Sequence, residues 1–310
     1  MKIKGKFKGI KLRRRKPRAT GRKPRRLKYI SVLPTFITLM NGVCGFLAIV
    51  ISSRSPETRW HLDFMDVSGI SPYTLAAYLI FVAMFADMMD GRVARLTRTT
   101  SSFGGQLDSL SDVISFGAAP AFIMIKLVEY HITYVEMTSV FFSMHLGRLV
   151  IFSAIFYVMC TVLRLARFNV ENIEDESAHM DFSGIPSPGA AGVVASLVVF
   201  QQQILPGISA GDIAGLSLAN FLTVLVLPIT TLLMGILMVS RVSYPHIANK
   251  LLRGKKSLPV IMLFFAAILI SIWNIQLVLV LCFCGFALFG IFRWIISGLF
   301  RKRDKQEAKE

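Results

Sequence analysis

The sequence predicts an all-α protein, a polytopic bundle of about eight transmembrane helices. Two observations lead to this fold class. First, 54% of the residues are hydrophobic, 17% are charged and the mean hydropathy is +0.60, which is far more apolar than a soluble domain. Second, several apolar runs are about 20 residues long, which is enough to cross a hydrocarbon core. A chain of 310 residues then has little length left for a large soluble domain.

The candidate spans follow the apolar runs along the chain. They are expected at residues 30–52, 73–90, 112–130, 139–163, 187–206, 214–239, 258–274 and 276–296. The first six spans form the predicted core, residues 29–250. The last two, within 251–297, are expected to be packing or oligomer-forming helices, and a charged cytoplasmic tail follows at 298–310.

The positive charge of the chain is concentrated at its start. Residues 1–28 contain 15 Lys and Arg and no acidic residue, together with Gly and Pro and few apolar residues. This composition predicts a disordered basic arm. The favoured interpretation is a cytoplasmic topology signal that contacts anionic lipid head groups. RNA or ribosome binding is the less favoured alternative, and no nucleic-acid partner is expected. A secretory signal peptide is excluded because the following apolar run is too long and lacks a cleavage pattern.

Loop charges predict the orientation in the membrane. Basic residues outnumber acidic ones in the loops at 91–111 and 240–257 and in the tail, whereas the loop at 53–72 holds two Arg against three acids. The acid-rich loop at 164–186 is an exception, but acids contribute little to the positive-inside rule. We therefore expect an integral protein of the cytoplasmic membrane with both termini on the cytoplasmic side.

Four aspartates lie at the cytoplasmic ends of the second and third spans. Asp87 and Asp90 are three residues apart and Asp108 and Asp112 are four apart, so each pair shares a helix face. Because the two spans are antiparallel neighbours, both pairs reach the same depth. Carboxylates at the edge of a low-dielectric region require positive charge between them. Oxygen ligands without His or Cys favour Mg²⁺ or Mn²⁺, and four acids can hold two such ions.

The stretch between the two pairs is suited to a phosphate ligand. Gly91 follows the first pair directly, and Gly104 and Gly105 precede the second, so no Cβ blocks a ligand at these points. Ala94 keeps the same side small. Arg95 lies one helical turn beyond Gly91 and can make paired hydrogen bonds to a phosphate.

These residues form a pattern that resembles the signature of the CDP-alcohol phosphotransferases. The pattern is D-x-x-D-G-x-x-A-R, then eight residues, then G-x-x-x-D-x-x-x-D. It is matched at Asp87, Asp90, Gly91, Ala94, Arg95, Gly104, Asp108 and Asp112. The resemblance implies an enzyme that displaces CMP from a CDP-linked lipid or alcohol with two divalent metal ions, and it also implies a homodimer.

The resemblance also implies a role for each residue. Asp87, Asp90, Asp108 and Asp112 would be metal ligands, and Asp112 would also be the catalytic base for the acceptor hydroxyl. The four small or basic positions that would line the site for the cytidine diphosphate are Gly91, Ala94, Arg95 and Gly104.

Other segments resemble a group within this family, the membrane-integrated phosphatidylserine synthases. They are DSLSDVISFGAAPAF (108–122), TVLRLARFNV (161–170), FSGIPSPGAAG (182–192) and SRVSYPHI (240–247). The segment LPTFITLMNGVCGFLA (33–48) is similar to the first span of the group, although Thr35 stands where an Asn is usual. The resemblance covers roughly residues 30–250, and it implies CDP-diacylglycerol and L-serine as substrates.

Polar residues at the end of the fourth span and the start of the fifth agree with an amino-acid acceptor. They are Arg164, Arg167, Asn169 and Ser187. An Arg suits the carboxylate of such an acceptor, and a Ser or Asn suits its ammonium or hydroxyl group. Two alternatives stay open: the arginines anchor the helix at the interface, or one of them binds the lipid-linked phosphate.

Two other functions are weighed against this hypothesis. Within the same chemistry, the acceptor could be glycerol-3-phosphate, inositol, choline or a second phospholipid. In a different class, the acids could be the cation site of a transporter, which predicts carboxylates near the bilayer midplane and paired half-helices. The five histidines and four cysteines show no spacing typical of metal ligands, so no zinc site and no disulfide are expected.

Overall fold

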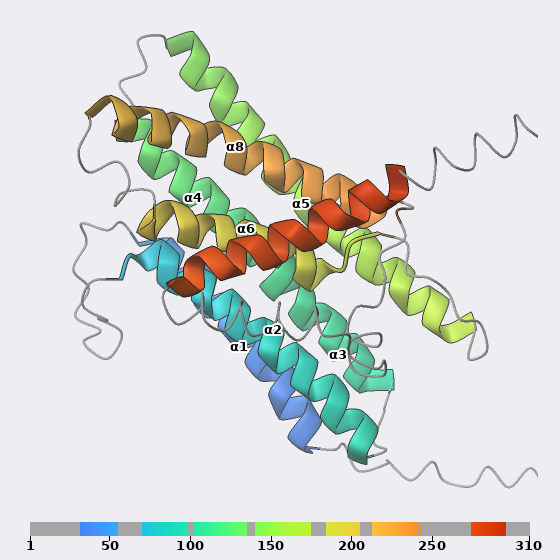
Figure 1. Cartoon of the computed structure of the whole chain (residues 1–310). Helices are drawn as coiled ribbons and strands as arrows, with labels where there is room; N and C mark the ends of the chain where they lie inside the picture. Colours follow the sequence, from blue (N-terminus) through green and yellow to red (C-terminus); the bar gives the residue numbers. More distant parts are fainter. Residues whose placement is uncertain are drawn as a thin grey trace, which may run out of the picture. The chain divides into compact units, whose positions relative to one another are not determined.

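The computed structural model describes residues 32–54, 70–97, 102–134, 140–174, 184–204, 213–240, 242 and 274–295, and all regular structure in these ranges is helical (Figure 1). The elements are α1 (Val32–Ser52), α2 (Pro72–Thr97), α3 (Ser102–Asp112), the π-helix η2 (Val113–Ala118), α4 (Ala119–Tyr134), α5 (Val140–Glu174), α6 (Ser187–Gln203), α8 (Ile213–Val239) and a C-terminal helix (Asn274–Ile295). The predicted all-α class is confirmed.

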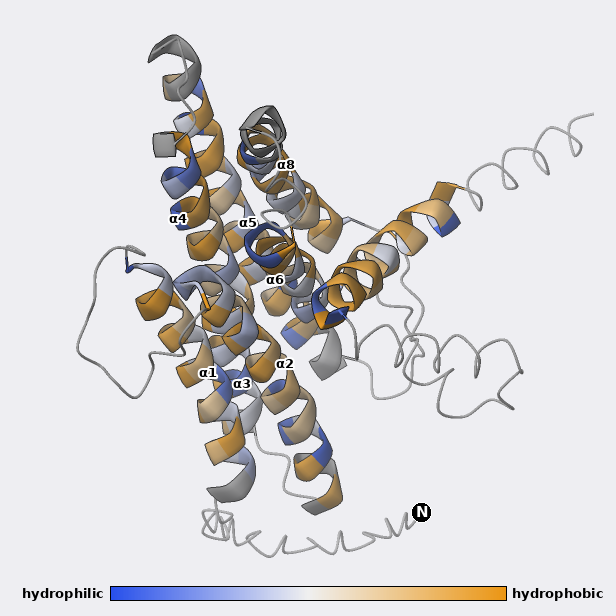
Figure 2. Ribbon diagram, turned by 60° about the vertical axis from the view of Figure 1, so that its left-hand side comes forward, coloured by the Kyte–Doolittle hydropathy of each residue, from blue (hydrophilic) through white to orange (hydrophobic). Residues whose placement is uncertain are grey.

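The helices have the length and surface of a membrane bundle. Five stretches are long and apolar enough to cross a bilayer: Pro34–Ser52, Pro72–Val93, Phe103–Ile132, Met144–Val170 and Asn274–Ile295. The apolar stretch Thr223–Val239 is shorter, and α6 has 17 residues. Apolar residues, orange in Figure 2, cover much of the C-terminal helix and of α1 and α2, and many large apolar side chains are exposed, as lipid contact requires. The polytopic membrane fold is confirmed, and the number of eight spans stays a prediction.

Three helices extend beyond the apolar runs that predicted them. α2 continues to Thr97, α3 already begins at Ser102, and α5 continues to Glu174. Gly91 and Gly104 were expected in a loop and are instead helical. Hydropathy marks the depth of the bilayer rather than the end of a helix, and residues such as Arg, Ala and Leu continue a helix into water. The predicted arm, the span at 258–274 and the charged tail lie outside the described residues.

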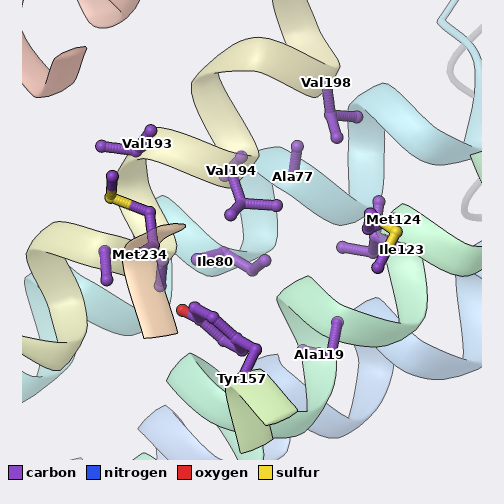
Figure 3. Packing of buried hydrophobic residues seen from close by; sticks show 14 of the residues in the cluster. Ala77, Ile80, Ala119, Ile123, Met124, Tyr157, Val193, Val194, Val198 and Met234 are labelled. Carbon is purple, nitrogen blue, oxygen red and sulfur yellow. The ribbon is translucent and has the colours of Figure 1, made fainter. Parts of the chain in front are cut away.

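The apolar core lies where α2, α4, α5, α6 and α8 meet (Figure 3). Its side chains are almost fully buried, and those labelled in Figure 3 are Ala77, Ile80, Ala119, Ile123, Met124, Tyr157, Val193, Val194, Val198 and Met234. The only polar atom among these side chains, the Tyr157 hydroxyl, donates a hydrogen bond to the Phe116 carbonyl oxygen at 2.9 Å. This bond attaches α5 to the π-helix.

Helix α1 packs closely against α3 and η2 because two glycines lie at the contact. A Cβ added to Gly45 would lie 2.5 Å from the Cα atom of Ser115, and one added to Gly42 would lie 3.2 Å from the Ser111 Oγ atom. Small residues of this kind let two membrane helices approach at backbone distance. The contact places α1 beside the helix that carries Asp108 and Asp112.

The C-terminal helix runs antiparallel to α6. The Gln276 Nε2 atom donates to the Gln203 Oε1 atom at 2.5 Å, near the end of α6. Near the start of α6, the Phe286 ring lies against Gly189, and a Cβ added to that glycine would lie 3.3 Å from the ring. Between these two contacts, the Phe283 ring packs on α6 at Gly192. The described part of the C-terminal region is therefore a packing helix on the surface of the core.

The α1 contact predicts a specific stability change. We expect Gly45→Ala to lower the free energy of unfolding by about 1–3 kcal/mol, because the new methyl group must push the Ser115 backbone away. Thermal unfolding of the purified protein in detergent measures this effect. The matched control is Gly147→Ala, since a Cβ at Gly147 meets nothing within 4 Å. An equal loss of stability in both variants would contradict the close α1 contact.

Candidate functional site

Three of the four aspartates converge between α2 and α3. One carboxylate oxygen from each of Asp87, Asp90 and Asp108 lies within 4.8 Å of the others. Asp90 is buried, with 6% of its surface exposed, and the other two are half-buried. We call these three residues the aspartate cluster. The shared helix faces read from the sequence agree with this convergence.

Two carboxylate oxygens of the aspartate cluster are buried and accept no hydrogen bond within the described part of the chain. They are Asp90 Oδ2 and Asp108 Oδ1. A buried charged oxygen without a partner is costly. A hard cation prefers carboxylate oxygen ligands, so the donor atoms of the aspartate cluster fit Mg²⁺ or Mn²⁺. Both the number of carboxylates and the two buried oxygens without a hydrogen-bond partner support a metal site here.

Asp112 stands next to the aspartate cluster but is held separately. It is the last residue of α3 and is 7% exposed. The Asn41 Nδ2 atom of α1 donates a hydrogen bond to Asp112 Oδ1 at 2.9 Å. The Asp112 charge also interacts with those of Asp87 and Asp108. The fourth aspartate therefore borders the aspartate cluster, with one of its oxygens already engaged by the protein.

Arg164 of α5 faces the same part of the site. Its guanidinium Nη1 donates to the Ser187 Oγ atom at 2.9 Å, and its charge interacts with that of Asp112. Ser187 is 1% exposed. The buried serine orients the guanidinium group, and the guanidinium lies on the Asp112 side of the site.

The chain segment before α6 fixes the position of Ser187. The Gly184 N–H donates to the Val242 carbonyl at 2.8 Å, and the Ile185 N–H donates to the Leu237 carbonyl at 3.2 Å. Gly184 has a φ of +95°, a conformation that favours glycine. Pro188, the second residue of α6, suits the first helical turn because its missing N–H is not needed there. The segment is thus attached to the end of α8 immediately before Ser187.

The remaining predicted residues have different surroundings. Asn169 Nδ2 donates to Ser109 Oγ at 2.9 Å, so it joins α5 to α3 beside Asp108. Arg167 is exposed on α5. Gly91 lies on α2 beside Asp90, and a Cβ added to it would meet nothing within 4 Å. Packing therefore does not require this glycine, and the open space is available to a ligand.

Three positions of the signature can be assigned to a helix but not to a side-chain contact. Gly104 lies in α3, and Ala94 and Arg95 lie in the last turns of α2. The side chains of Ala94 and Arg95 are outside the described residues. Their predicted contact with cytidine diphosphate stays a prediction.

Sequence reasoning missed the contribution of α1 to the site. Thr38 lies beside the Asp90 carboxylate and Asn41 hydrogen-bonds Asp112, and a spacing of three puts both on one face of α1. The available signal was an asparagine within an otherwise apolar span, because a polar side chain at that depth is costly unless it has a partner.

Comparisons with known proteins place this geometry in context. The sequence model for the CDP-alcohol phosphatidyltransferase family matches residues 31–232. The chain is similar to a CDP-diacylglycerol–serine O-phosphatidyltransferase of Methanocaldococcus jannaschii, with 29% identity over 270 residues that cover 87% of this chain and 97% of that protein. A protein of the same description from Helicobacter pylori is 32% identical over 237 residues, covering 76% and 86%. Another from Bacillus subtilis is 28% identical over 217 residues, covering 70% and 92%.

The aspartate cluster predicts a metal-dependent change in stability. With a chelator present, we expect Asp90→Asn to unfold at a higher temperature than the wild type, because one of three mutually repelling charges is lost. With Mn²⁺, the order reverses, and the affinity for Mn²⁺ falls at least about tenfold. Electron paramagnetic resonance of free Mn²⁺ and thermal unfolding measure the two effects. Glu129→Gln is the control, since that exposed carboxylate pairs with Lys126. Unchanged Mn²⁺ affinity in Asp90→Asn would contradict a metal site here.

Proposed function

Because the chain belongs to the CDP-alcohol phosphatidyltransferase family, we propose that it transfers the phosphatidyl group of CDP-diacylglycerol to the hydroxyl group of L-serine. The products are phosphatidylserine and CMP. The family membership rests on the match over residues 31–232. The choice of acceptor is supported by relatives described as serine O-phosphatidyltransferases and by the residues around Asp112.

The observation that carries the choice of an amino-acid acceptor is the position of Arg164. Its guanidinium, held by Ser187, lies close enough to Asp112 for their charges to interact. An amino acid needs a cation for its carboxylate near the group that accepts its hydroxyl proton. Arg164 and Asp112 supply this combination. Inositol carries no carboxylate and would make no use of a half-buried arginine in this way.

The aspartate cluster is the proposed site for the activated lipid. Asp87, Asp90 and Asp108 would hold two Mg²⁺ or Mn²⁺ ions, with Asp112 at their border. Such ions, when bound, neutralise charge on the pyrophosphate and on the departing CMP. The open space at Gly91 and the neighbouring positions Ala94, Arg95 and Gly104 would line the cytidine diphosphate site.

The proposed transfer occurs in one displacement. The serine hydroxyl oxygen attacks the phosphorus that carries the diacylglycerol, and Asp112 accepts the hydroxyl proton. The new oxygen–phosphorus bond forms as the bond to the CMP oxygen breaks, and CMP leaves with that electron pair. Arg164 holds the serine carboxylate so that the hydroxyl is oriented toward the phosphorus. Arg167 and Asn169 extend this side of the site along α5.

The location of the site is part of the proposal. The aspartates lie on α2 and α3, the two helices on either side of the connection that the loop charges assign to the cytoplasmic side of the inner membrane. CDP-diacylglycerol then enters from the inner leaflet and L-serine from the cytosol. Both chain termini are cytoplasmic, the basic arm at 1–28 contacts anionic lipid head groups, and the protein is a homodimer.

A direct assay tests the reaction. The purified protein, given CDP-diacylglycerol and radiolabelled L-serine, should release CMP and transfer the label into lipid, and a chelator or Asp112→Asn should abolish both. Release of CMP with glycerol-3-phosphate or inositol but not with serine would replace the acceptor. Metal-dependent transport into proteoliposomes without CMP release would favour a transporter instead.

A substitution of Arg164 tests the acceptor site. We expect Arg164→Ala to raise the KM for L-serine about 10- to 100-fold, because a hydrogen bond to a charged group contributes about 1.5–3 kcal/mol, and to leave the KM for CDP-diacylglycerol nearly unchanged. The matched control on the same helix is Arg148→Ala, whose side chain is exposed and contacts Met144. An unchanged KM for serine with a raised KM for the lipid would assign Arg164 to the lipid phosphate.

A further inference from the structure

Asn41 is a buried polar side chain in the middle of an apolar helix. It is 0% exposed and lies within the span Pro34–Ser52. Its amide Nδ2 donates to Asp112 Oδ1 at 2.9 Å, across 71 positions of the chain. Its own Oδ1 is buried without a hydrogen-bond partner among the described residues. The bond to Asp112 is therefore the interaction that offsets the cost of burying this amide.

The orientation of the Asn41 amide follows from the chemistry of the two groups. A carboxylate oxygen accepts hydrogen bonds, so the NH₂ end of the amide must face Asp112. The reverse orientation would place two oxygen atoms against each other. The amide donor is neutral, so it adds no charge beside Asp112.

The backbone around Asn41 is fixed from a second direction. Ser115 Oγ donates to the Asn41 carbonyl oxygen at 2.8 Å, and Ser115 lies in the π-helix that begins directly after Asp112. The glycines at 42 and 45 allow this approach, because a Cβ at either would press on Ser111 or Ser115. Asn41 and Asp112 are thus held against each other by the backbone packing as well as by the side-chain bond.

We propose that Asn41 is the positioning residue for Asp112. By holding Oδ1, the amide sets the plane of the carboxylate and directs Oδ2 toward the acceptor hydroxyl. Among the side-chain hydrogen bonds of the described residues, the one from Asn41 reaches an Asp112 oxygen from another helix. The inference rests on the proposed function, in which Asp112 accepts the proton of the acceptor.

The main test replaces the amide by a side chain of similar volume without a donor, Asn41→Leu. We expect kcat to fall about 10- to 100-fold, the size expected for a lost hydrogen bond to a charged group. The KM values for L-serine and CDP-diacylglycerol should stay within about threefold. Ser52→Ala is the matched control, because Ser52 is also buried in α1 and, within the part of the chain that the structure describes, bonds to its own helix at Ala48 and Ile49. That variant should keep the wild-type kcat.

A double-mutant cycle separates positioning from general destabilisation. If Asn41 acts through Asp112, Asn41→Leu causes little further loss of kcat in the Asp112→Asn background. A readout independent of activity accompanies it: the rise in unfolding temperature caused by Mn²⁺ and CDP should be the same in Asn41→Leu and the wild type. If Asn41→Leu does not fold, Asn41→Ser is used, which is polar but too short to reach Asp112, and the same loss of kcat is expected.

Several results would overturn the inference. A wild-type kcat in Asn41→Leu would do so, and so would a proportional fall of kcat, serine affinity and the Mn²⁺ and CDP stabilisation. The inference would also be contradicted if the fold-losses of kcat in Asn41→Leu and Asp112→Asn multiplied in the double mutant. Failure of the proposed function looks different: Asp112→Asn itself would keep serine-dependent activity, or no acceptor would be phosphatidylated. An inactive Asp112→Asn beside a fully active Asn41→Leu refutes this inference alone.

Discussion

Mutual repulsion of carboxylates at the edge of the bundle is the constraint on which the rest of the site depends. Charges within 4.8 Å of each other repel by roughly 3 kcal/mol per pair at the effective dielectric constant that describes protein sites. Three such pairs approach the whole net stability of a typical domain, about 5–15 kcal/mol. A divalent cation bound between Asp87, Asp90 and Asp108 would offset this repulsion. Asp90 Oδ2 and Asp108 Oδ1 accept no hydrogen bond from the described residues, so these two oxygens are free to bind such a cation.

The sequence was sufficient for features that depend on local spacing and composition. Apolar runs predicted the membrane helices, and spacings of three and four predicted that the aspartates share helix faces. Helix ends were predicted less well, because the change from apolar to polar residues near Asp90 and Arg164 marks the membrane surface, whereas α2 and α5 continue as helices to Thr97 and Glu174. The same spacing rule could not distinguish Asp112 from the aspartate cluster, since the difference arises from its bond to another helix.

The contacts that the sequence did not predict all join residues far apart in the chain. Asn41 and Asp112 are 71 positions apart, and Asn169 and Ser109 are 60 apart. Periodicity reports which face of a helix is polar, but it does not report which helix that face meets. For α1 the deciding factor is the glycine contact at Gly45, which brings the helix to backbone distance from Ser115. An asparagine within an apolar span therefore indicates a polar partner on another helix, because its amide is costly to bury alone.

The position of Arg164 depends on packing outside the family match as well as within it. Arg164 is oriented by Ser187, and the segment preceding Ser187 is attached to α8 by the Ile185 N–H, which donates to the Leu237 carbonyl. The C-terminal helix also contacts this region, because Phe286 packs on Gly189, two residues after Ser187. The start of α6 therefore contacts α8 and the C-terminal helix, and neither of these two helices carries a residue of the aspartate cluster. Because a guanidinium binds a carboxylate only in a narrow geometry, these contacts at the start of α6 would support the proposed acceptor site through Arg164.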